Sequence, residues 1–182
     1  MRKSVIVSNR LPLQISKLEN SFLFQPSSGG LATGLDSVHK NNDSIWVGWS
    51  GITSDELTKK NKLEIKNTLD DLRLIEVEVN QKEVDEFYHG LSNKCIWPLF
   101  HYFIELAKFN EIDWLTYVDV NKKFCERVIQ NTEQNGVVWV HDYQLMLLPK
   151  LIKEKRPDLT IGFFLHIPFP VSYTHLRAHE TS

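Results

Sequence analysis

The stretch from residue 136 to residue 170, GVVWVHDYQLMLLPKLIKEKRPDLTIGFFLHIPFP, constrains the fold more than any other part of the chain. Its two apolar runs, 137–140 and 161–165, are rich in β-branched and aromatic residues, which is typical of strands buried on both faces of a parallel sheet. Between them, apolar residues repeat at helical spacing: Leu145, Leu148, Leu151 and Ile152. Basic residues follow, as suits the C-terminal end of a helix, and Pro157 ends it. The stretch predicts a right-handed strand–helix–strand unit of an α/β fold.

Polar residues come directly after the strands of this unit and after a third candidate strand at 4–7. His141 and Asp142 follow the first strand of the unit, His166 follows the second, and Arg10 ends the triplet Ser-Asn-Arg after residues 4–7. Ligands of open α/β sheets bind outside the carboxyl ends of the strands, so these residues predict a site. For the triplet alone, a solvated turn is the competing interpretation.

The totals describe an ordinary globular chain. Its 182 residues suffice for one domain with a substantial core, and 42% of them are hydrophobic and 24% charged. A net charge of −2 gives no general attraction to nucleic acid or to an anionic membrane. Two cysteines, without a signal peptide or an apolar run of membrane-spanning length, indicate the cytoplasm.

The remaining elements follow from periodicity and turn residues. A polar turn joins 13–15 to 22–25 in a β-hairpin, and period two over 73–79 indicates a strand with one solvated face. Asn80 is expected to cap a helix over 81–88 that Gly90 closes. The other expected elements are a strand at 44–49 and helices over 31–38, over 55–72 in one or two pieces on the surface, and over 110–134, where Trp114 has core-like spacing.

Two further segments could bind a ligand. Ser28, Gly29 and Gly30 open a helix, and free backbone N–H groups at such a point suit a phosphate, although a plain loop has the same composition. The aromatic-rich segment 91–102, which contains Trp97, could stack on a sugar or serve as a lid over the core.

Several chemistries find no support in the residue pattern. No His and Cys residues have the spacing of a metal site, so a metal could be bound only if folding gathered distant ligands. No G-x-S-x-G motif indicates an α/β hydrolase. The residues that remain suit a phosphorylated sugar, because arginine binds phosphate through paired hydrogen bonds, aspartate accepts from hydroxyls and aromatic rings line a pocket. These residues are Arg10, the Ser28–Gly30 loop, Tyr88, Trp97, Asp142 and His166.

Six motifs in a fixed order resemble the trehalose-6-phosphate synthase family, glycosyltransferase family 20, over residues ~4–170. The motifs are VSNRLP at 7–12, SSGGLATGL at 27–35, WVGWSG at 46–51, EFYHGLSNKCIWPLFHY at 86–102, VWVHDYQLMLLP at 138–149 and IGFFLHIPFP at 161–170. The resemblance implies a retaining glycosyltransferase of the GT-B type, in which residues 1–170 form the Rossmann-like, acceptor-binding N-terminal domain. It also implies the reaction, transfer of glucose from UDP-glucose to glucose 6-phosphate to give α,α-trehalose 6-phosphate.

The resemblance also implies a role for each matching residue. Arg10 and Tyr88 hold the acceptor phosphate, and Asp142 accepts hydrogen bonds from the acceptor sugar. The donor is bound by three residues, with Gly29 and Gly30 at its diphosphate and His166 at the transferred glucose. Asp142 and His166 are the expected catalytic residues, and Trp97 and Ile167 wall the acceptor pocket and select the α-anomer. Neither a cofactor nor a metal is implied, because basic side chains and helix N-termini neutralise the diphosphate in this family.

The chain departs from the family after Pro170. The family continues with a Ser/Thr-x-Glu-x-Phe pattern and a C-terminal donor domain, whereas residues 171–182 read VSYTHLRAHETS, which we interpret as a tail foreign to the family. We expect residues 1–182 alone to be inactive and to bind glucose 6-phosphate weakly. The alternatives are a non-catalytic sugar-phosphate-sensing member of the family and a GT-B enzyme with another acceptor. The donor could also carry GDP or ADP, a phosphatase domain could follow, and a homo-oligomer is possible.

Overall fold

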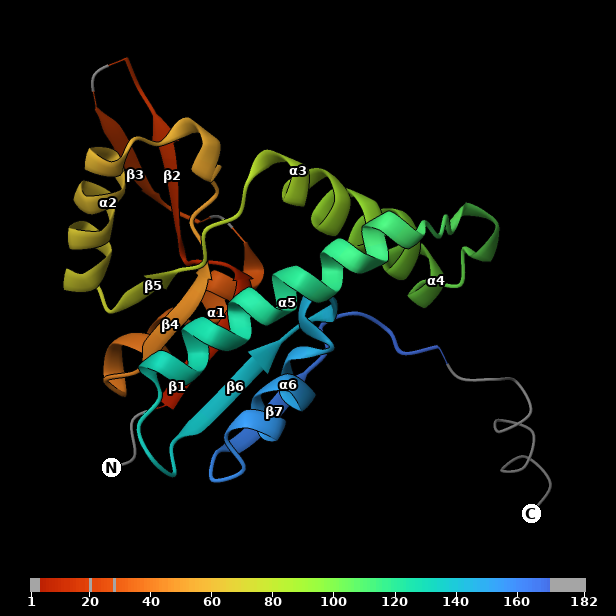
Figure 1. Ribbon diagram of the computed structural model, residues 1–182. Coiled ribbons are helices and arrows are strands. Elements are labelled where there is room, and N and C mark those ends of the chain that lie inside the picture. Colours follow the sequence, from red (N-terminus) through yellow and green to blue (C-terminus); the bar gives the residue numbers. More distant parts are fainter. Residues whose placement is uncertain (1–3, 20, 28, 171–182) are drawn as a thin grey trace.

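The centre of the structure is a sheet of five parallel strands in the order β5-β4-β1-β6-β7 (Figure 1). The computed structural model describes residues 4–19, 21–27 and 29–170. The strands are β1 (Ser4–Arg10), β4 (Ile45–Trp49), β5 (Leu74–Glu76), β6 (Val137–His141) and β7 (Thr160–Phe164). The predicted parallel α/β fold is confirmed, and the order reverses direction between β1 and β6, where an open sheet places its ligand.

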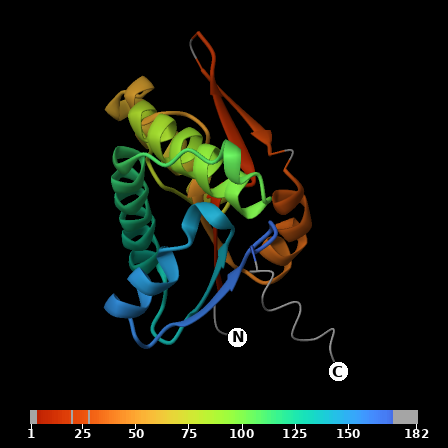
Figure 2. The ribbon, with the colours of Figure 1, turned by 90° about the vertical axis from the view of Figure 1, so that its right-hand side faces the viewer.

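The predicted β-hairpin is also confirmed. Strands β2 (Leu13–Lys17) and β3 (Phe22–Pro26) pair antiparallel and form a second, two-stranded sheet. The hairpin stands away from the main sheet, with its turn at the far end (Figures 1 and 2). Ile15 of the hairpin is nevertheless 2% exposed, because it packs with Leu11 and Ile52 beside the sheet. The hairpin base therefore belongs to the core of the domain.

Side chains of β1 alternate between two hydrophobic clusters, one on each face of the sheet. Val5 and Val7 contribute to a cluster formed with η2, α5 and α6, whereas Ile6 contributes to a cluster formed with α1 and α2. All three are at most 1% exposed. A strand covered on both faces needs apolar residues at successive positions, which explains the unbroken apolar run Val5-Ile6-Val7.

Helices pack on both faces of the main sheet. The α-helices are α1 (Gly30–Asn41), α2 (Lys59–Asp71), α3 (Gln81–Glu83), α4 (Trp97–Phe100), α5 (Glu111–Asn131) and α6 (Leu148–Lys155), and the other helical segments are η1 (Ser54–Glu56), η2 (Val84–Ile96), η3 (Ile104–Leu106) and η4 (Tyr143–Leu145). The helix expected over 55–72 does form in two pieces, η1 and α2. Asn80 caps α3 as predicted, since its side chain accepts from the backbone N–H of Glu83 at 2.8 Å while the Glu83 carboxylate accepts from that of Asn80.

Gly90 does not close a helix, so that prediction was wrong. The chain continues as η2, a π-helix that leads directly into α4. A Cβ atom on Gly90 would lie 2.5 Å from a carboxylate oxygen of Asp113, so glycine at this position permits η2 and α5 to pack closely. A small residue that serves helix packing looks the same in a sequence as one that ends a helix.

Three other expectations need correction. The strand expected over 161–165 is not buried on both faces, because β7 forms the edge of the sheet and its Phe163 and Phe164 are 41% and 51% exposed. Trp114 is 38% exposed and not a core residue. The strand expected over 73–79 shortens to β5, although the backbone N–H of Val77 still donates to the Gly48 carbonyl at 2.8 Å.

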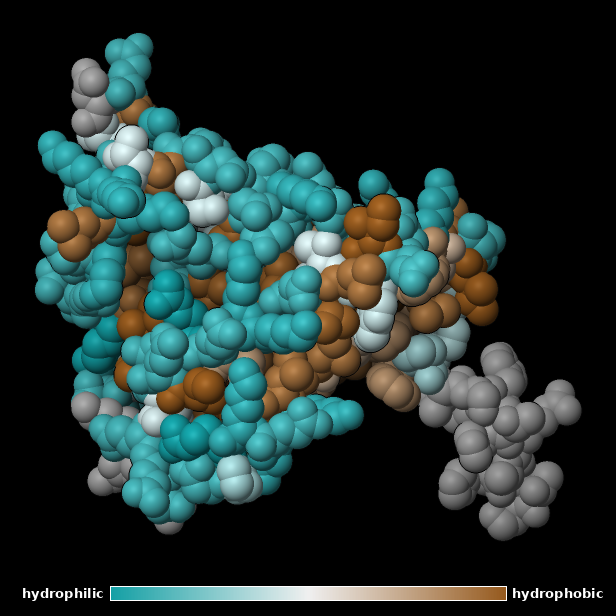
Figure 3. All heavy atoms as spheres, in the orientation of Figure 1, coloured by the Kyte–Doolittle hydropathy of each residue, from teal (hydrophilic) through white to brown (hydrophobic). Residues whose placement is uncertain are grey.

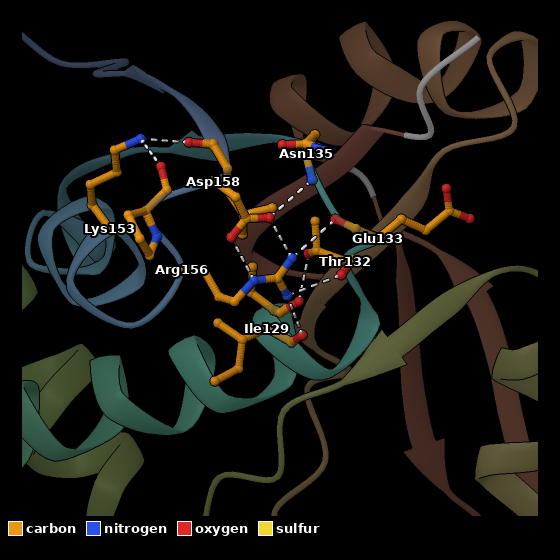
Figure 4. A network of polar contacts seen from close by, with 10 residues as sticks. Ile129, Thr132, Glu133, Asn135, Lys153, Arg156 and Asp158 are labelled. Carbon is orange, nitrogen blue, oxygen red and sulfur yellow. Dashed lines mark hydrogen bonds and ion pairs between the residues drawn. The ribbon is translucent and has the colours of Figure 1, made fainter.

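At the amino ends of β6 and β7, Arg156 ties three segments together (Figure 4). Its guanidinium donates to both carboxylate oxygens of Asp158 at 2.8 Å and to the carbonyls of Ile129, Thr132 and Glu133 at 3.2–3.4 Å. Asp158 in turn accepts from the backbone N–H of Asn135 at 2.9 Å. The end of α5, the turn before β6 and the turn before β7 are thus joined through one side chain.

Hydrophobic surface gathers over α4, η3 and the start of α5 (Figure 3). The exposed residues there include Phe103, Ile104, Leu106, Phe109, Ile112 and Leu115. The segment 91–102 is mixed, because Phe100 is 8% exposed whereas Trp97 and Tyr102 are 40% and 54% exposed, so it both packs on the core and presents aromatic rings outward. Among the described residues, no helix combines the length and the apolar character needed to cross a membrane.

Candidate active site

The predicted polar residues meet at the carboxyl ends of β1, β6 and β7. Arg10 is the last residue of β1 and His141 the last of β6, Asp142 follows His141, and His166 lies two residues beyond β7. Because β1 and β6 are the neighbours between which the strand order reverses, these side chains surround the place where an open α/β sheet binds its ligand.

Arg10 is positioned by stacking. Its guanidinium carbon lies 4.3 Å from the ring centroid of Trp49, the last residue of the neighbouring strand β4. The Trp49 ring is itself fixed, because its Nε1–H donates to the carbonyl of Ile52 at 2.8 Å. Gly51 has φ +97, and a Cβ on it would lie 2.6 Å from an Arg10 guanidinium nitrogen, so glycine is required there for backbone and packing alike. Burial lowers the pKa of Arg10, and Tyr88 acts on that pKa in the opposite direction.

Tyr88 and Tyr143 bring η2 and η4 to the same cluster. The Tyr143 hydroxyl donates to Oδ1 of Asn93 on η2 at 2.9 Å. Burial raises the pKa of Tyr143, and the charges of Asp142 and Tyr88 raise it further. The charge of Tyr88 thus acts on both Arg10 and Tyr143. Arg10 ends β1 and Asp142 follows β6, the strand paired with β1, so two of the three residues predicted for the acceptor lie at neighbouring strand ends.

Asp142 has an unusual backbone and a well-defined side chain. Its φ of 77° and ψ of 168° fall in a region that is essentially restricted to glycine. Its Oδ1 accepts from the backbone N–H of Tyr143 at 2.9 Å and from that of His166 at 3.3 Å, and its own N–H donates to the Phe164 carbonyl at 2.8 Å. Asp142 thus connects the end of β6 to β7 and to the segment after it. The N–H groups of Tyr143 and His166 share one carboxylate oxygen, Oδ1.

His141 and His166 form a hydrogen-bonded pair. Nδ1 of His141 lies 3.0 Å from Nε2 of His166. The His141 ring also lies 4.5 Å from the Trp139 ring, and the His166 ring 4.7 Å from that of Phe164. Burial, followed by the neighbouring His166, lowers the pKa of His141 to about 4, so His141 is neutral at physiological pH.

A cavity of about 310 Å³ lies beside this pair. Its lining comes from α1, β6, β7 and the segment after β7: Gly30, Leu31, Gly34, Leu35, Trp139, His141, Phe164 and His166. A Cβ on Gly29, Gly30 or Gly34 would meet nothing within 4 Å, so the packing of the described residues does not demand glycine there. Gly30 and His166, predicted to bind the diphosphate and the glucose of one donor molecule, therefore share a cavity. Ser28 lies outside the described residues.

Comparison with known proteins gives the family. The family model for glycosyltransferase family 20 matches residues 2–176. The chain belongs to glycosyltransferase family 20. It is 43% identical over 168 residues to the trehalose-6-phosphate synthase of Mycobacterium leprae and 44% identical over 170 residues to the UDP-forming α,α-trehalose-phosphate synthase A of Dictyostelium discoideum. These matches cover 91% and 92% of this chain but 33% and 22% of the relatives, so the chain spans a third of their length or less.

Solved structures of the family share the fold. The trehalose-6-phosphate synthase of E. coli bound with UDP-2-fluoro glucose aligns with a TM-score of 0.71 at 28% identity, over 98% of this chain and 36% of that one. An α,α-trehalose-phosphate synthase of Burkholderia xenovorans in complex with glucose 6-phosphate aligns with a TM-score of 0.70 at 28% identity, over 96% and 36% of the two chains. The Rossmann-like GT-B domain expected from the motifs is thus confirmed.

In this family 20 chain, the two residues expected to wall the acceptor pocket lie on adjoining segments. Trp97 stacks on His101 with ring centroids 4.0 Å apart, and Ile167 is half-buried against the larger core cluster. The rings of Phe100 and Phe169, 5.7 Å apart, hold α4 against the segment after β7. The two segments are joined, and Trp97 presents 40% of its surface to solvent.

Sequence reasoning missed three features of the site. Trp49 lies within the WVGWSG motif, but no role for it as the platform of Arg10 was predicted. Tyr143 follows Asp142 directly, and its link to Asn93 could not be inferred because the two residues are 50 positions apart. The contact between His141 and His166 was also missed, although both histidines were predicted to lie near the site. Among the residues that the structure describes, no group of three or more His, Cys, Asp or Glu side chains could hold a metal ion.

Proposed function

We propose that the protein containing this chain transfers glucose from UDP-glucose to glucose 6-phosphate, with retention of configuration, to give α,α-trehalose 6-phosphate and UDP. The observation that carries the proposal is that two groups of candidate residues lie next to each other at the carboxyl ends of β1, β6 and β7. Arg10, Tyr88 and Asp142 form one half, and the cavity lined by Gly30 and His166 forms the other. Relatives solved with UDP-2-fluoro glucose and with glucose 6-phosphate support a donor and an acceptor of these two kinds.

In the acceptor half, Arg10 supplies the charge that binds the phosphate. A guanidinium offers five N–H donors in a planar fork that fits two phosphate oxygens, and stacking on Trp49 leaves the edge of that fork available. The Tyr88 hydroxyl binds the same phosphate. Asp142 accepts hydrogen bonds from the sugar hydroxyls, while Trp97 and Ile167 wall the pocket and favour the α-anomer.

In the donor half, the start of α1 faces the diphosphate. Gly29 and Gly30 open a helix of 12 residues, and the N-terminus of a helix attracts anions through its free N–H groups and its dipole. Gly30 carries no side chain into the cavity, so the diphosphate can approach the backbone. His166 contacts the transferred glucose and orients its anomeric carbon.

The chemistry that these residues can perform is positioning and charge stabilisation. The acceptor hydroxyl attacks from the face of the sugar that the leaving phosphate departs from, and a departing phosphate oxygen takes the acceptor proton. The N-terminus of α1 stabilises the negative charge that grows on the leaving diphosphate, while Arg10 holds the acceptor in position through its phosphate.

The proposal extends to the organisation of the protein. We propose that residues 1–170 form the acceptor-binding domain and that residues 1–182 alone do not turn over, because the relatives are about three times longer. The free cysteines Cys95 and Cys125 support a reducing compartment such as the cytoplasm.

The test is a product assay on the protein at the length of its relatives. With UDP-glucose and glucose 6-phosphate we expect equal amounts of UDP and trehalose 6-phosphate, and with unphosphorylated glucose almost none. Asp142→Asn keeps an oxygen for the backbone N–H groups of Tyr143 and His166 but removes the charge, so it should lower kcat/KM about 10- to 100-fold without unfolding the protein. Binding of glucose 6-phosphate without any turnover would instead identify a non-catalytic sensor.

A further inference from the structure

His141 has no role in the proposed reaction, yet it is the most buried polar side chain beside the cavity. It is 1% exposed, its Nδ1 contacts His166, and its Nε2 is buried with no hydrogen-bond partner among the described residues. Trp139 lies against one side of the ring and Phe164 lies 6.5 Å away, so the imidazole is held by packing. A polar ring buried at this cost, with one nitrogen aimed at a site residue, requires an explanation.

The contact between the two histidines restricts where their hydrogens lie. Two imidazole nitrogens 3.0 Å apart need one hydrogen between them, so one ring donates and the other accepts. If His141 accepted at Nδ1, its own hydrogen would lie on Nε2, as a buried N–H without an acceptor. If His141 donates from Nδ1, the unpartnered Nε2 carries only a lone pair. Orphaned N–H groups are the rarer of these two cases in proteins.

We propose that His141 is a positioning residue that donates Nδ1–H to Nε2 of His166 and thereby fixes both the ring orientation and the tautomer of His166. His166 must then carry its hydrogen on Nδ1. This nitrogen can donate to an oxygen of the ligand in the adjoining cavity, which for the proposed function is an oxygen of the nucleotide sugar. The inference rests on the proposed function for that ligand, but the contact between the histidines does not depend on it.

A second contact shows that His166 is held from two sides. Its backbone N–H donates to Asp142 Oδ1 at 3.3 Å, which places the main chain, whereas the ring is placed by His141 at 3.0 Å. Without the His141 contact the imidazole of His166, on an exposed residue, could rotate and exchange tautomers. A wrong tautomer in a functional histidine can cost far more activity than the loss of one hydrogen bond costs stability.

Two substitutions separate positioning from packing. His141→Asn places an amide near the position of Nδ1 and can still donate to His166, whereas His141→Phe keeps the ring volume and removes the donor. In the protein at the length of its relatives, we expect His141→Phe to lower kcat about 10- to 100-fold, the size of loss seen when a group that orients a metal-bound histidine is removed. We expect His141→Asn to stay within about fivefold of the wild type, and KM for glucose 6-phosphate to change little in either variant.

A double substitution tests whether the effect passes through His166. In a His166→Ala background, His141→Phe should lower kcat by less than about twofold further, because the two residues act as a unit. An equal loss in His141→Asn and His141→Phe would overturn the proposal. So would a lowered melting temperature with unchanged kcat, or a full effect of His141→Phe in the His166→Ala background.

The tautomer can be read without any catalytic activity. In the same full-length protein labelled with ¹⁵N-histidine, we expect the ¹⁵N shifts of His166 to report a hydrogen on Nδ1, and His141→Phe to produce a mixture of tautomers. A hydrogen on Nε2 of His166 in the wild type would overturn the proposal. If the wild type forms no product, the proposed function fails, while these spectra still decide the role of His141.

Discussion

Arg10 and Arg156 lie at opposite ends of the same sheet and are used in opposite ways. Every guanidinium nitrogen of Arg156 donates to an oxygen of this chain: Nε and Nη2 to Asp158, Nη2 also to the Glu133 carbonyl, and Nη1 to the carbonyls of Ile129 and Thr132. Arg10 has no hydrogen bond or ion pair from its guanidinium within the part of the chain that the structure describes, and is held by the ring of Trp49. One arginine completes the fold, and the other has its donors available for the proposed acceptor phosphate.

The largest expected effect comes from removing Arg10. Arg10→Ala should lower kcat/KM for glucose 6-phosphate about 100-fold, since hydrogen bonds to a charged group contribute roughly 1.5–3 kcal/mol each. The melting temperature should change little, because the only contact with this chain described for the Arg10 guanidinium is its stacking on Trp49. Steady-state kinetics and a thermal melt measure both quantities. A clear fall in melting temperature with an unchanged KM would mean that Arg10, like Arg156, stabilises the fold.

Acid should affect the two ends in different pH ranges. The pKa of His141 in the folded protein is lowered to about 4, whereas in the unfolded chain it has the ordinary value of about 6.5. As the pH drops from about 6.5 to about 4, the proton binds to His141 in the unfolded chain but not in the folded protein, so the stability of the fold decreases. The free energy of unfolding decreases by at most about 3 kcal/mol over this range. The pKa of Asp158 is lowered by Arg156, so its contribution disappears only below the ordinary pKa of an aspartate, about 3.9.

Urea unfolding between pH 7 and pH 4 measures the first range. His141→Phe should flatten the pH dependence there, because the substituted residue does not titrate. Asp158→Asn is the matched control at the other end and should leave the slope between pH 6.5 and pH 4 unchanged. An equally steep slope in His141→Phe would show that another group accounts for the acid sensitivity.

The smallest effect is expected from removing Arg156, at the amino ends of β6 and β7. Arg156→Ala removes the link between α5 and the turns before β6 and β7, and should lower the melting temperature by a few degrees. The kcat of the folded protein should stay at the wild-type value, because the network lies at the end of the sheet away from the site. A lowered kcat at a temperature where the variant is folded would break the contrast between the two arginines.

The sequence predicted the parallel sheet, the hairpin and the strand-end position of the site, since these follow from local periodicity and from polar residues after apolar runs. It did not predict features that depend on distant contacts. Gly90 packs against Asp113 on another helix, and the exposure of β7 follows from its place at the sheet edge, which no local pattern encodes.

In the site, too, residues marked by a local pattern were predicted and residues that depend on distant contacts were not. Arg10, Asp142 and His166 could be named because each comes shortly after an apolar run, whereas the contacts of Trp49 and Tyr143 are made with partners that only the fold brings near. The role expected for Gly29 and Gly30 came from the family resemblance. The structure adds that neither glycine is needed for packing among the described residues.

The backbone at Asp142 has a consequence for any effort to make this protein more robust. A φ of 77° with a ψ of 168° costs a residue other than glycine roughly 1–3 kcal/mol. A screen that rewards thermal stability, or a design procedure that scores backbone geometry, would therefore choose glycine at position 142. That choice would delete the carboxylate beside Tyr143 and His166, and the more stable protein would have lost a residue proposed to bind the acceptor sugar.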